Sequence, residues 1–517
     1  MKLNYKRTLL VGFAFFLISL FWQAYDSTIP LLLTNKFGMS QGWSGVIMAI
    51  DNILALFMLP LFGSLSDKVN TRYGKRTPFI TVGTVIAAVA LIALSFVDAA
   101  QLKNIAAVSA IDDPTALEIL YESQCDAQLL TPEGESFVLS EQFSKEEFAA
   151  ITSKITDENG KSVTNPAYTN YVAPARQAYA AQVTADNPST LILFVALLLI
   201  VLLSMATFRS PAVALMPDVT IKPLRSKANA IINLMGTGGG ILVLVLGMVF
   251  GTSKIHNSLM SYTPFYGLIA GIMLGSLLLF LLTVREKKWA EEMRAESIRL
   301  GIEEEEPVED GEKRGLDKAE LKSLLCILVS IALWYFGYNA VTSKYAVYAA
   351  NVLQKDYNTT MLIAQGAAIV TYLPAGMIAS KIGRKKTILG GIVMLAGAFG
   401  IASFMRTDSP TIVMNILFAM AGIGWANINV NSFPMVVEMC SGADIGKYTG
   451  FYYTASMSAQ IATPMLSGIL MDKMGMTILF PYAAIFAALA FVTMSMVKHG
   501  DAKVEAKTGL DAFDIDD

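Results

Sequence analysis

The sequence predicts an all-α membrane protein with twelve transmembrane helices in two related six-helix bundles. Three observations support this fold class. Of the 517 residues, 54% are hydrophobic and only 16% are charged, and the mean hydropathy is +0.51, which is more apolar surface than a soluble core can bury. The apolar segments are long enough to span a bilayer. A basic connection between two such segments occurs once in each half of the chain.

The basic connection orients the chain and relates its halves. Residues 51–79 contain an apolar run that stops near Gly63 and resumes at Pro78 after a turn rich in Lys and Arg, and residues 374–386 repeat the pattern from Gly376 onward. Short basic loops resist translocation, so both turns are expected in the cytoplasm. The repeat predicts two related halves. The alternative is a pair of unrelated membrane hairpins that both end in basic residues.

The first half is expected at residues 1–97 and 189–284. Its first apolar run follows a short basic segment, is too long for a signal peptide and lacks a small-residue cleavage site. We therefore expect a retained helix that starts in the cytoplasm. The later spans alternate in direction, and their inner connections carry Lys and Arg. The six spans are expected near residues 8–33, 42–65, 78–97, 189–216, 228–250 and 264–284.

Residues 98–188 form an insert between the third and fourth spans. The segment is acidic, has no apolar stretch long enough to span a bilayer, and is too long for a plain connection. Helix-start signals at Asp113, Ser144 and Pro174 predict a small helical domain over the extracytoplasmic mouth. Two roles remain open for this domain: a lid or docking surface, or a lineage-specific decoration.

The second half is expected at residues 323–497, after a charged cytoplasmic linker at 285–322 and before an acidic cytoplasmic tail at 498–517. Lys and Arg are concentrated on the inner loops of both halves. This distribution predicts a multi-pass protein of the cell (plasma) membrane with both termini in the cytoplasm. The spans are expected near residues 323–349, 361–380, 387–405, 411–437, 448–470 and 476–497.

The motifs at the cytoplasmic ends resemble those of the major facilitator superfamily, over the whole chain apart from the insert and the linker. Residues 72–79, RYGKRTPF, and residues 216–225 are similar to the branch that holds sucrose-type transporters and the glycoside-pentoside-hexuronide cation symporters. The resemblance implies import of a sugar, a mono- or disaccharide or a glycoside, together with a coupling cation by alternating access.

One departure from that branch concerns the cation. Its sodium-using members carry two acids in their second helix, one immediately before a proline and one a turn earlier. Here Leu59 and Ala55 stand at those places relative to Pro60, and the acid of this span, Asp51, lies a turn further out. The sequence therefore favours a proton over sodium as the coupling cation.

Two acids within the predicted spans are the candidate coupling residues. Because an unpaired charge in the hydrocarbon region is costly, Asp26 and Asp51 are expected to face the protein interior, at similar depth by the helical rise. Loss of water there favours the protonated form, so either could bind and release a proton. Both residues, with Asn52, are also candidate substrate ligands. The alternatives are an acid at the outer interface for Asp26 and a hydrogen bond within a tight helix pair for Asp51.

Arg209 lies in the inner third of its span, too deep for a loop charge, and resembles the helix 4 arginine of sucrose-type carriers. One interpretation is contact with a substrate or an acid. The favoured interpretation is that it closes the cytoplasmic side by pairing with Asp67 or Asp218. The charges at the cytoplasmic ends of the spans are interpreted as gating and structural groups: Asp67, Arg72, Arg76, Asp218, Arg225 and Glu438.

A sugar site requires amides, carboxylates and aromatic rings at mid-depth, because a sugar has hydroxyl groups in many directions and flat C–H faces. Trp334 and Asn339 are the first choice. For any single residue, a hydrogen bond between helices is the alternative role. The candidate substrate ligands in the second half are Trp334, Tyr335, Tyr338, Asn339, Asn427, Asn431, Tyr452 and Gln460.

Other classes of function lack their residues. Two histidines and three cysteines without paired spacing predict no metal cluster or disulfide framework. No phosphate-binding Gly-x-x-x-x-Gly-Lys-Ser/Thr motif occurs, no nucleophile, base and acid set is visible, and the net charge of −3 indicates no nucleic-acid partner. We expect a monomer that is not an enzyme, needs no cofactor besides the coupling cation, and has a small sugar and the lipid bilayer as partners. Two alternatives remain open: a carrier of the same fold for a non-sugar solute, and a membrane receptor of the same fold that has lost transport.

Overall fold

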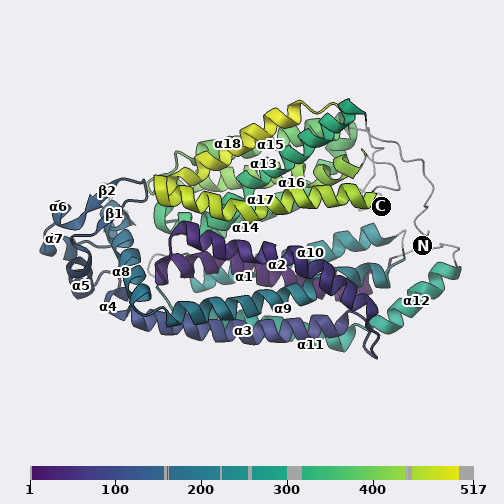
Figure 1. Cartoon of the computed structure of the whole chain (residues 1–517), viewed down its shortest axis with the longest axis horizontal. Coiled ribbons are helices and arrows are strands. Elements are labelled where there is room, and N and C mark those ends of the chain that lie inside the picture. Colours follow the sequence, from purple (N-terminus) through teal and green to yellow (C-terminus); the bar gives the residue numbers. More distant parts are fainter. Residues whose placement is uncertain are drawn as a thin grey trace.

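The computed structural model describes residues 3–156, 160, 162–221, 224–253, 259–299, 317–437, 439 and 445–499. Within these residues it confirms the predicted all-α membrane fold. The long helices of the first half lie side by side with those of the second half (Figure 1). The first half contains α1 (Tyr5–Leu31), η1 (Leu32–Lys36), α2 (Gln41–Lys68), α3 (Thr77–Asn104), α9 (Ser189–Val219), α10 (Arg225–Phe250) and α11 (Thr263–Thr283).

The second half begins at Lys318, five residues before the expected start, because Asp317 and Glu320 form a capping box at the first turn. This half contains α13 (Lys318–Tyr348), η5 (Ala349–Leu353), α14 (Tyr357–Ile382), α15 (Arg384–Ala402), α16 (Thr411–Val437), α17 (Ile445–Met474), η7 (Met476–Ile478) and α18 (Leu479–Ser495).

The two halves repeat one pattern of helix packing. α1 packs on α10 as α13 packs on α17, and α3 packs on α9 as α15 packs on α16. The α3–α11 contact likewise has its counterpart in α15–α18. Across the interface, α2 packs on α17 and α10 packs on α14, which are equivalent contacts under the same symmetry. The molecule is therefore two related bundles around a pseudo-twofold axis.

Ten helices within the described residues are long and apolar enough to cross a membrane. The two remaining long helices, α14 and α17, have 26 and 30 residues, which at about 1.5 Å per residue is sufficient to span the hydrocarbon core. Both pack against the opposite half. Their lower apolarity comes from polar side chains such as Gln365, Tyr372, Ser456 and Gln460, which lie on the helices that line the interface.

The insert lies at one end of the molecule, opposite α12 (Figure 1), and it is not purely helical as expected. Two short antiparallel hairpins interrupt its helices. The predicted cap at Asp113 and the capping box at Ser144 are both present. The elements are α4 (Ala106–Ser109), α5 (Pro114–Gln124), β1 (Gln128–Leu130), β2 (Ser136–Val138), α6 (Leu139–Gln142), α7 (Lys145–Ala149), β3 (Lys154–Thr156), β4 (Ser162–Thr164), η2 (Tyr168–Val172) and α8 (Ala173–Asp186).

The third span is longer than expected. α3 continues to Asn104, seven residues past Val97, because the polar residues Asp98 and Gln101 are buried inside the protein rather than placed in water.

A separate hydrophobic core, around Leu117, fills the insert. The linker also contains structure, since its first part forms α12 (Glu286–Arg299).

Candidate functional site

Three charged side chains from three helices of the first half face one another. Asp26 of α1 and Asp51 of α2 both interact electrostatically with Arg209 of α9 and with each other. Asp51 accepts a hydrogen bond from Asn52 Nδ2 at 2.9 Å. Both carboxylate side chains belong to half-buried residues. The structure thus brings the predicted acids together inside the protein.

Arg209 does not close the cytoplasmic side as the sequence suggested. Its guanidinium lies over the Trp22 ring at 5.5 Å and near the two acids, whereas Asp67 and Asp218 both pair with Arg76. Asp218 lies nine residues beyond Arg209 on α9, about 13 Å along the helix. That distance separates the arginine from the cytoplasmic charges.

An aromatic cluster in the second half faces the interface. Tyr338 stacks on Trp425 of α16 with ring centroids 3.8 Å apart, and Tyr335 contacts the same indole edge-on at 5.3 Å. Tyr335 also interacts with Tyr452 of α17. Trp425 was not predicted from the sequence, although a lone tryptophan close to glycine and asparagine in an apolar helix was an available signal.

Trp334, the first choice from the sequence, lies elsewhere. Its side chain is 0% exposed in the hydrophobic core of the second half, with Ile331 and Tyr345 on the same face of α13. Trp334 therefore packs inside its own bundle, whereas the rings of Tyr335 and Tyr338 contact Trp425 of α16. Asn339 is half-buried, and its Nδ2 has no hydrogen-bond partner among the described residues.

The side-chain amides of the two predicted asparagines of α16 donate hydrogen bonds to backbone carbonyls of the same helix. Asn427 Nδ2 donates to Ile423 O at 3.1 Å, and Asn431 Nδ2 donates to Asn427 O at 2.8 Å. Asn427 Oδ1 is buried without a partner among the described residues. Gln460 of α17 is half-buried.

Two glutamines connect the halves at mid-depth. Gln365 Nε2 of α14 donates to Gln23 Oε1 of α1 at 2.5 Å, and Gln23 Nε2 donates to Ser27 at 2.9 Å. Gly240 of α10 leaves room beside both amides. Neither glutamine was singled out in the sequence, because nothing in the local pattern shows which residues of two helices in different halves meet.

These groups form one belt around the interface, which we call the central polar band. Arg209 interacts with Tyr453 of α17, whose ring contacts Tyr452, and Tyr338 interacts with Tyr372 of α14. The acidic and basic groups lie in the first half and the aromatic groups in the second. The band consists of Gln23, Asp26, Asp51, Arg209, Tyr335, Tyr338, Gln365, Tyr372, Trp425, Tyr452 and Tyr453.

The cytoplasmic turn of the first half is held by charges. Arg76, 5% exposed, bonds to Asp218 at 2.7 Å and to Asp67 at 2.5 Å. Glu286, at the start of α12, accepts hydrogen bonds from the backbone N–H groups of Arg76 and Thr77, both at 2.8 Å. A carboxylate at this position stabilises the N-terminus of α3. Glu286 was not predicted as a functional residue, because the sequence places it in the charged linker at 285–322.

Of the remaining predicted gating residues, the structure describes the side chain of Arg72. Arg72 lies over the ring of its neighbour Tyr73. Arg225 begins α10, but its side chain is not among the described groups, and Glu438 lies outside the described residues.

At the insert end, the two halves are bonded together. Asp472 of α17 accepts hydrogen bonds from the backbone N–H groups of Gln41 and Gly42 at the start of α2, both at 2.7 Å. Lys344 of α13 donates to Gln41 O at 2.7 Å. At the equivalent contact, Thr252, two residues after the end of α10, bonds to Tyr357 of α14 at 2.8 Å. The hydrogen bonds between the halves that we identify among the described residues lie at this end or at mid-depth.

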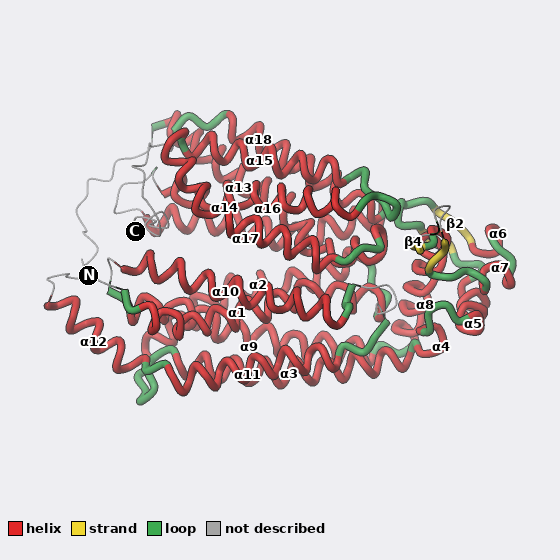
Figure 2. The backbone as a smooth tube through the Cα atoms, turned by 180° about the vertical axis from the view of Figure 1, so that it is seen from behind, coloured by secondary structure: helices red, strands yellow, loops and turns green. Residues whose placement is uncertain are grey.

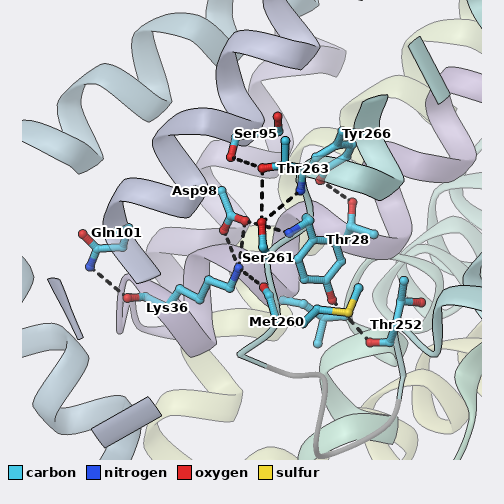
Figure 3. Close-up of polar contacts among 12 residues, drawn as sticks. Thr28, Lys36, Ser95, Asp98, Gln101, Thr252, Met260, Ser261, Thr263 and Tyr266 are labelled. Carbon is cyan, nitrogen blue, oxygen red and sulfur yellow. Dashed lines mark hydrogen bonds and ion pairs between the residues drawn. The ribbon is translucent and has the colours of Figure 1, made fainter. Parts of the chain in front are cut away.

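A buried ion pair fixes the outer end of α1 within the first half (Figure 3). Lys36 Nζ lies 2.6 Å and 2.8 Å from the two oxygens of Asp98 and 2.6 Å from Met260 O. Both side chains of the pair are 0% exposed. Gln101 Nε2 donates to Lys36 O at 2.9 Å. All three ammonium protons therefore have acceptors, and the pair joins α1, α3 and the α10–α11 connection.

Two family models match the chain. The model described as Major Facilitator Superfamily matches residues 324–512, and the model described as MFS/sugar transport protein matches residues 10–109. The chain is 26% identical over 132 residues to the MFS-type transporter ppzB of Metarhizium rileyi, which is 26% of this chain and 27% of the relative. It is 32% identical over 60 residues to the sucrose transport protein SUC4 of Arabidopsis thaliana, 12% of each chain. The alignments thus span about a quarter or less of these relatives.

Solved structures with a similar fold cover nearly the whole chain. The inward open xylose transporter XylE from E. coli has a TM-score of 0.57 at 16% identity, covering 99% of each chain. A peptide transporter POT in complex with sulfate has a TM-score of 0.58 at 11% identity, covering 95% of this chain and 93% of that one. This likeness shows the shared fold. Each half of the chain is thus similar over part of its length to a major facilitator family model, and the two related six-helix halves have the fold of these solved transporters.

Proposed function

We propose that this protein is a secondary active transporter that carries a sugar across the membrane together with one coupling cation, a proton in preference to sodium. The observation that carries the proposal is the central polar band, in which carboxylates and a guanidinium of one half face aromatic rings of the other. Charged side chains are costly at membrane depth, and where they occur they usually mark a substrate or ion pathway.

The charge balance of the band supports coupling to one cation. Asp26 and Asp51 carry two negative charges when ionised, and Arg209 carries one positive charge, so one negative charge is uncompensated. Binding of a single proton or monovalent cation neutralises the cluster, which lowers the cost of moving it through a closed state away from water. The absence of acids at Ala55 and Leu59 in the sequence favours the proton.

The opposite wall supports a sugar. The stacked pair of Tyr338 and Trp425 offers a flat face for the C–H surface of a pyranose ring, and the amides of Gln23 and Gln365 offer hydrogen-bond donors and acceptors for hydroxyl groups. The family model described as a sugar transport protein matches residues 10–109, which contain Gln23 and both acids.

The helix contacts support alternating access. Each half is a closely packed unit with its own hydrophobic core. The halves meet mainly at α2–α17, with smaller contacts at α10–α14 and α1–α13. Hydrogen bonds at the insert end keep that side closed in the described conformation. A transport cycle breaks these bonds and forms others at the cytoplasmic end, with both termini placed in the cytoplasm of the cell by the basic loops.

The test is uptake of a panel of labelled sugars into proteoliposomes, with proton and sodium gradients imposed separately. We expect accumulation of at least one mono- or disaccharide above equilibrium when the outside is acidic, with no requirement for sodium. Uptake driven only by sodium would overturn the choice of cation. Uptake of nucleosides or peptides but no sugar would identify a carrier for another solute, and binding without uptake of any solute would identify a receptor.

A further inference from the structure

The turn between β1 and β2 of the insert touches the second half of the molecule, although the insert belongs to the first half by sequence. Pro132 O accepts hydrogen bonds from the backbone N–H groups of Met476 at 2.8 Å and of Thr477 at 3.3 Å. Glu133 forms an ion pair with Arg406, in the α15–α16 connection, at 3.1 Å. We name this contact between residues 131–135 and residues 474–477, with Arg406, the outer clamp.

Two glycines allow the backbones in the clamp to meet. Gly134 and Gly475 both have positive φ angles, 92° and 88°. A Cβ atom on Gly134 would lie 2.5 Å from Met474 O, and one on Gly475 would lie 2.7 Å from the Cα of Gly134. These distances are shorter than any ordinary contact, so the surfaces fit closely only because neither residue has a side chain.

The insert is attached to the outer end of the first half at several points. Gln101 of α3 donates both to Lys36 O and to Thr184 of α8, at 2.9 Å and 3.0 Å. Gln177 of α8 donates to Asn35 at 2.9 Å. The insert therefore moves with the first half, and any separation of the halves on this side pulls the β1–β2 turn away from α17 and η7.

The outer clamp contacts the end of α17, where the hydrogen bonds between Asp472 and the start of α2 also lie. Asp472, which receives the N–H groups at the start of α2, is two residues before Met474. The strands of the insert lie at the end of the molecule where the outer ends of the helices gather (Figure 2). The end of α17 is thus held by the first half at two places, by α2 and by the insert.

We propose that the insert is part of the outer gate: the outer clamp stabilises the conformation that is closed on the insert side, and its release accompanies opening on that side. The proposal gives the insert a conformational role. From the sequence, two roles were open: a lid or docking surface, or a lineage-specific decoration. The inference concerns the equilibrium between two conformations of the protein alone, and it does not depend on the identity of the solute.

The test measures distances between spin labels in lipid nanodiscs without any solute. Labels are attached after Asp186→Cys, at the exposed end of α8, and Asp408→Cys, in the exposed α15–α16 connection, in a background with the three native cysteines changed to serine. Gly134→Ala should increase the ratio of long to short distances about tenfold, because it loosens the clamp and a tenfold shift needs only a modest change in free energy.

Gly160→Ala is the matched control. Gly160 lies in the turn of the other hairpin of the insert, also has a positive φ of 74°, and has nothing within 4 Å of a Cβ atom. It should leave the distances as in the parent protein. An unchanged distribution in Gly134→Ala, or an equal shift in Gly160→Ala, would overturn the proposal.

Four further variants separate release of the clamp from misfolding. Pro132→Cys combined with Thr477→Cys should form a disulfide on oxidation that fixes the short distance, whereas Leu130→Cys with Ser136→Cys, which are paired within the β1–β2 hairpin, should close a disulfide without fixing it. Glu133→Arg alone should favour the long distance, and Glu133→Arg with Arg406→Glu should restore the short one. Failure of the cross-link to restrict the distance would also overturn the proposal, whatever the result of the sugar uptake assay.

Discussion

Asp26 and Asp51 share a cluster, but their surroundings differ. Asp51 is held by Asn52, which donates a hydrogen bond to its carboxylate. Among the described residues, Asp26 interacts with Asp51 and Arg209 through charge, without a hydrogen bond to its carboxylate. A carboxylate without a fixed hydrogen bond is the better group for taking up and releasing a proton in each cycle. We therefore assign coupling first to Asp26 and positioning of Arg209 first to Asp51.

Asp26→Asn should abolish proton-driven accumulation while leaving exchange of solute across the membrane largely intact. The amide keeps the shape and a hydrogen-bonding group but cannot carry the proton. The measurement compares uphill uptake with counterflow in the same proteoliposomes. Asp408→Asn, an exposed acid on the outer side, is the control and should change neither. Accumulation at the parent level in Asp26→Asn would remove this residue from the coupling step.

Trp425→Ala should weaken apparent affinity for the sugar roughly threefold to tenfold, equivalent to about 0.5–1.5 kcal/mol of lost ring stacking. Trp334→Phe is the comparison, because Trp334 lies in the core and should affect thermal stability without changing affinity. Equilibrium binding and unfolding in detergent are measured on both proteins. Loss of affinity in Trp334→Phe with none in Trp425→Ala would return the site to the residue chosen from the sequence.

The sequence identifies the charged residues that are costly to bury in the membrane, but not the residues that they contact. Asp26, Asp51 and Arg209 stand out because charge is rare at that depth. Gln23 and Gln365 do not stand out. Trp334 was chosen and Trp425 was missed because helices that are apolar on all sides give little periodicity from which to infer their rotation. That rotation is set by contacts with other helices, including those of the opposite half.

At the scale of elements, the sequence places the membrane helices and errs at their ends. It ends the third span at Val97 because Asp98 looks like the start of an exterior loop, yet Asp98 is buried against Lys36, 62 residues earlier. The three-residue strands of the insert are too short to show an alternating pattern. The predicted helix starts at Asp113 and Ser144 in the insert are confirmed. They could be predicted because a helix cap depends only on residues that are neighbours in the sequence.

Asp98→Asn should lower the free energy of unfolding by about 3–5 kcal/mol, because it leaves the Lys36 ammonium buried beside a neutral partner. Denaturant titration of the purified protein in detergent measures the change. Combining Asp98→Leu with Lys36→Met should recover most of the loss, since no buried charge remains without its partner. A single variant as stable as the parent would show that the ion pair is not needed to join α1 and α3.

At the scale of the whole molecule, two halves with separate hydrophobic cores meet through helix contacts that include several glycines. At the outer end of α2 and α17, a Cβ atom on Gly45 would overlap Pro464 O, and one on Gly468 would overlap Gln41 O. Helices that approach this closely gain dispersion and weak hydrogen bonds without interlocking side chains. Such a contact can form and break as a unit, which suits halves that rock against each other.

Gly468→Val should therefore shift the protein toward the conformation that is open on the insert side, because the added side chain cannot fit against Gln41 O while the outer ends of α2 and α17 remain in contact. Spin labels at positions 186 and 408 should report longer distances in this variant. Gly450→Val, on the same helix but with nothing within 4 Å of its Cβ position, should leave the distances unchanged. If both valines shift the distances equally, α17 responds to any added bulk, and the close glycine contact is not what holds the outer side closed.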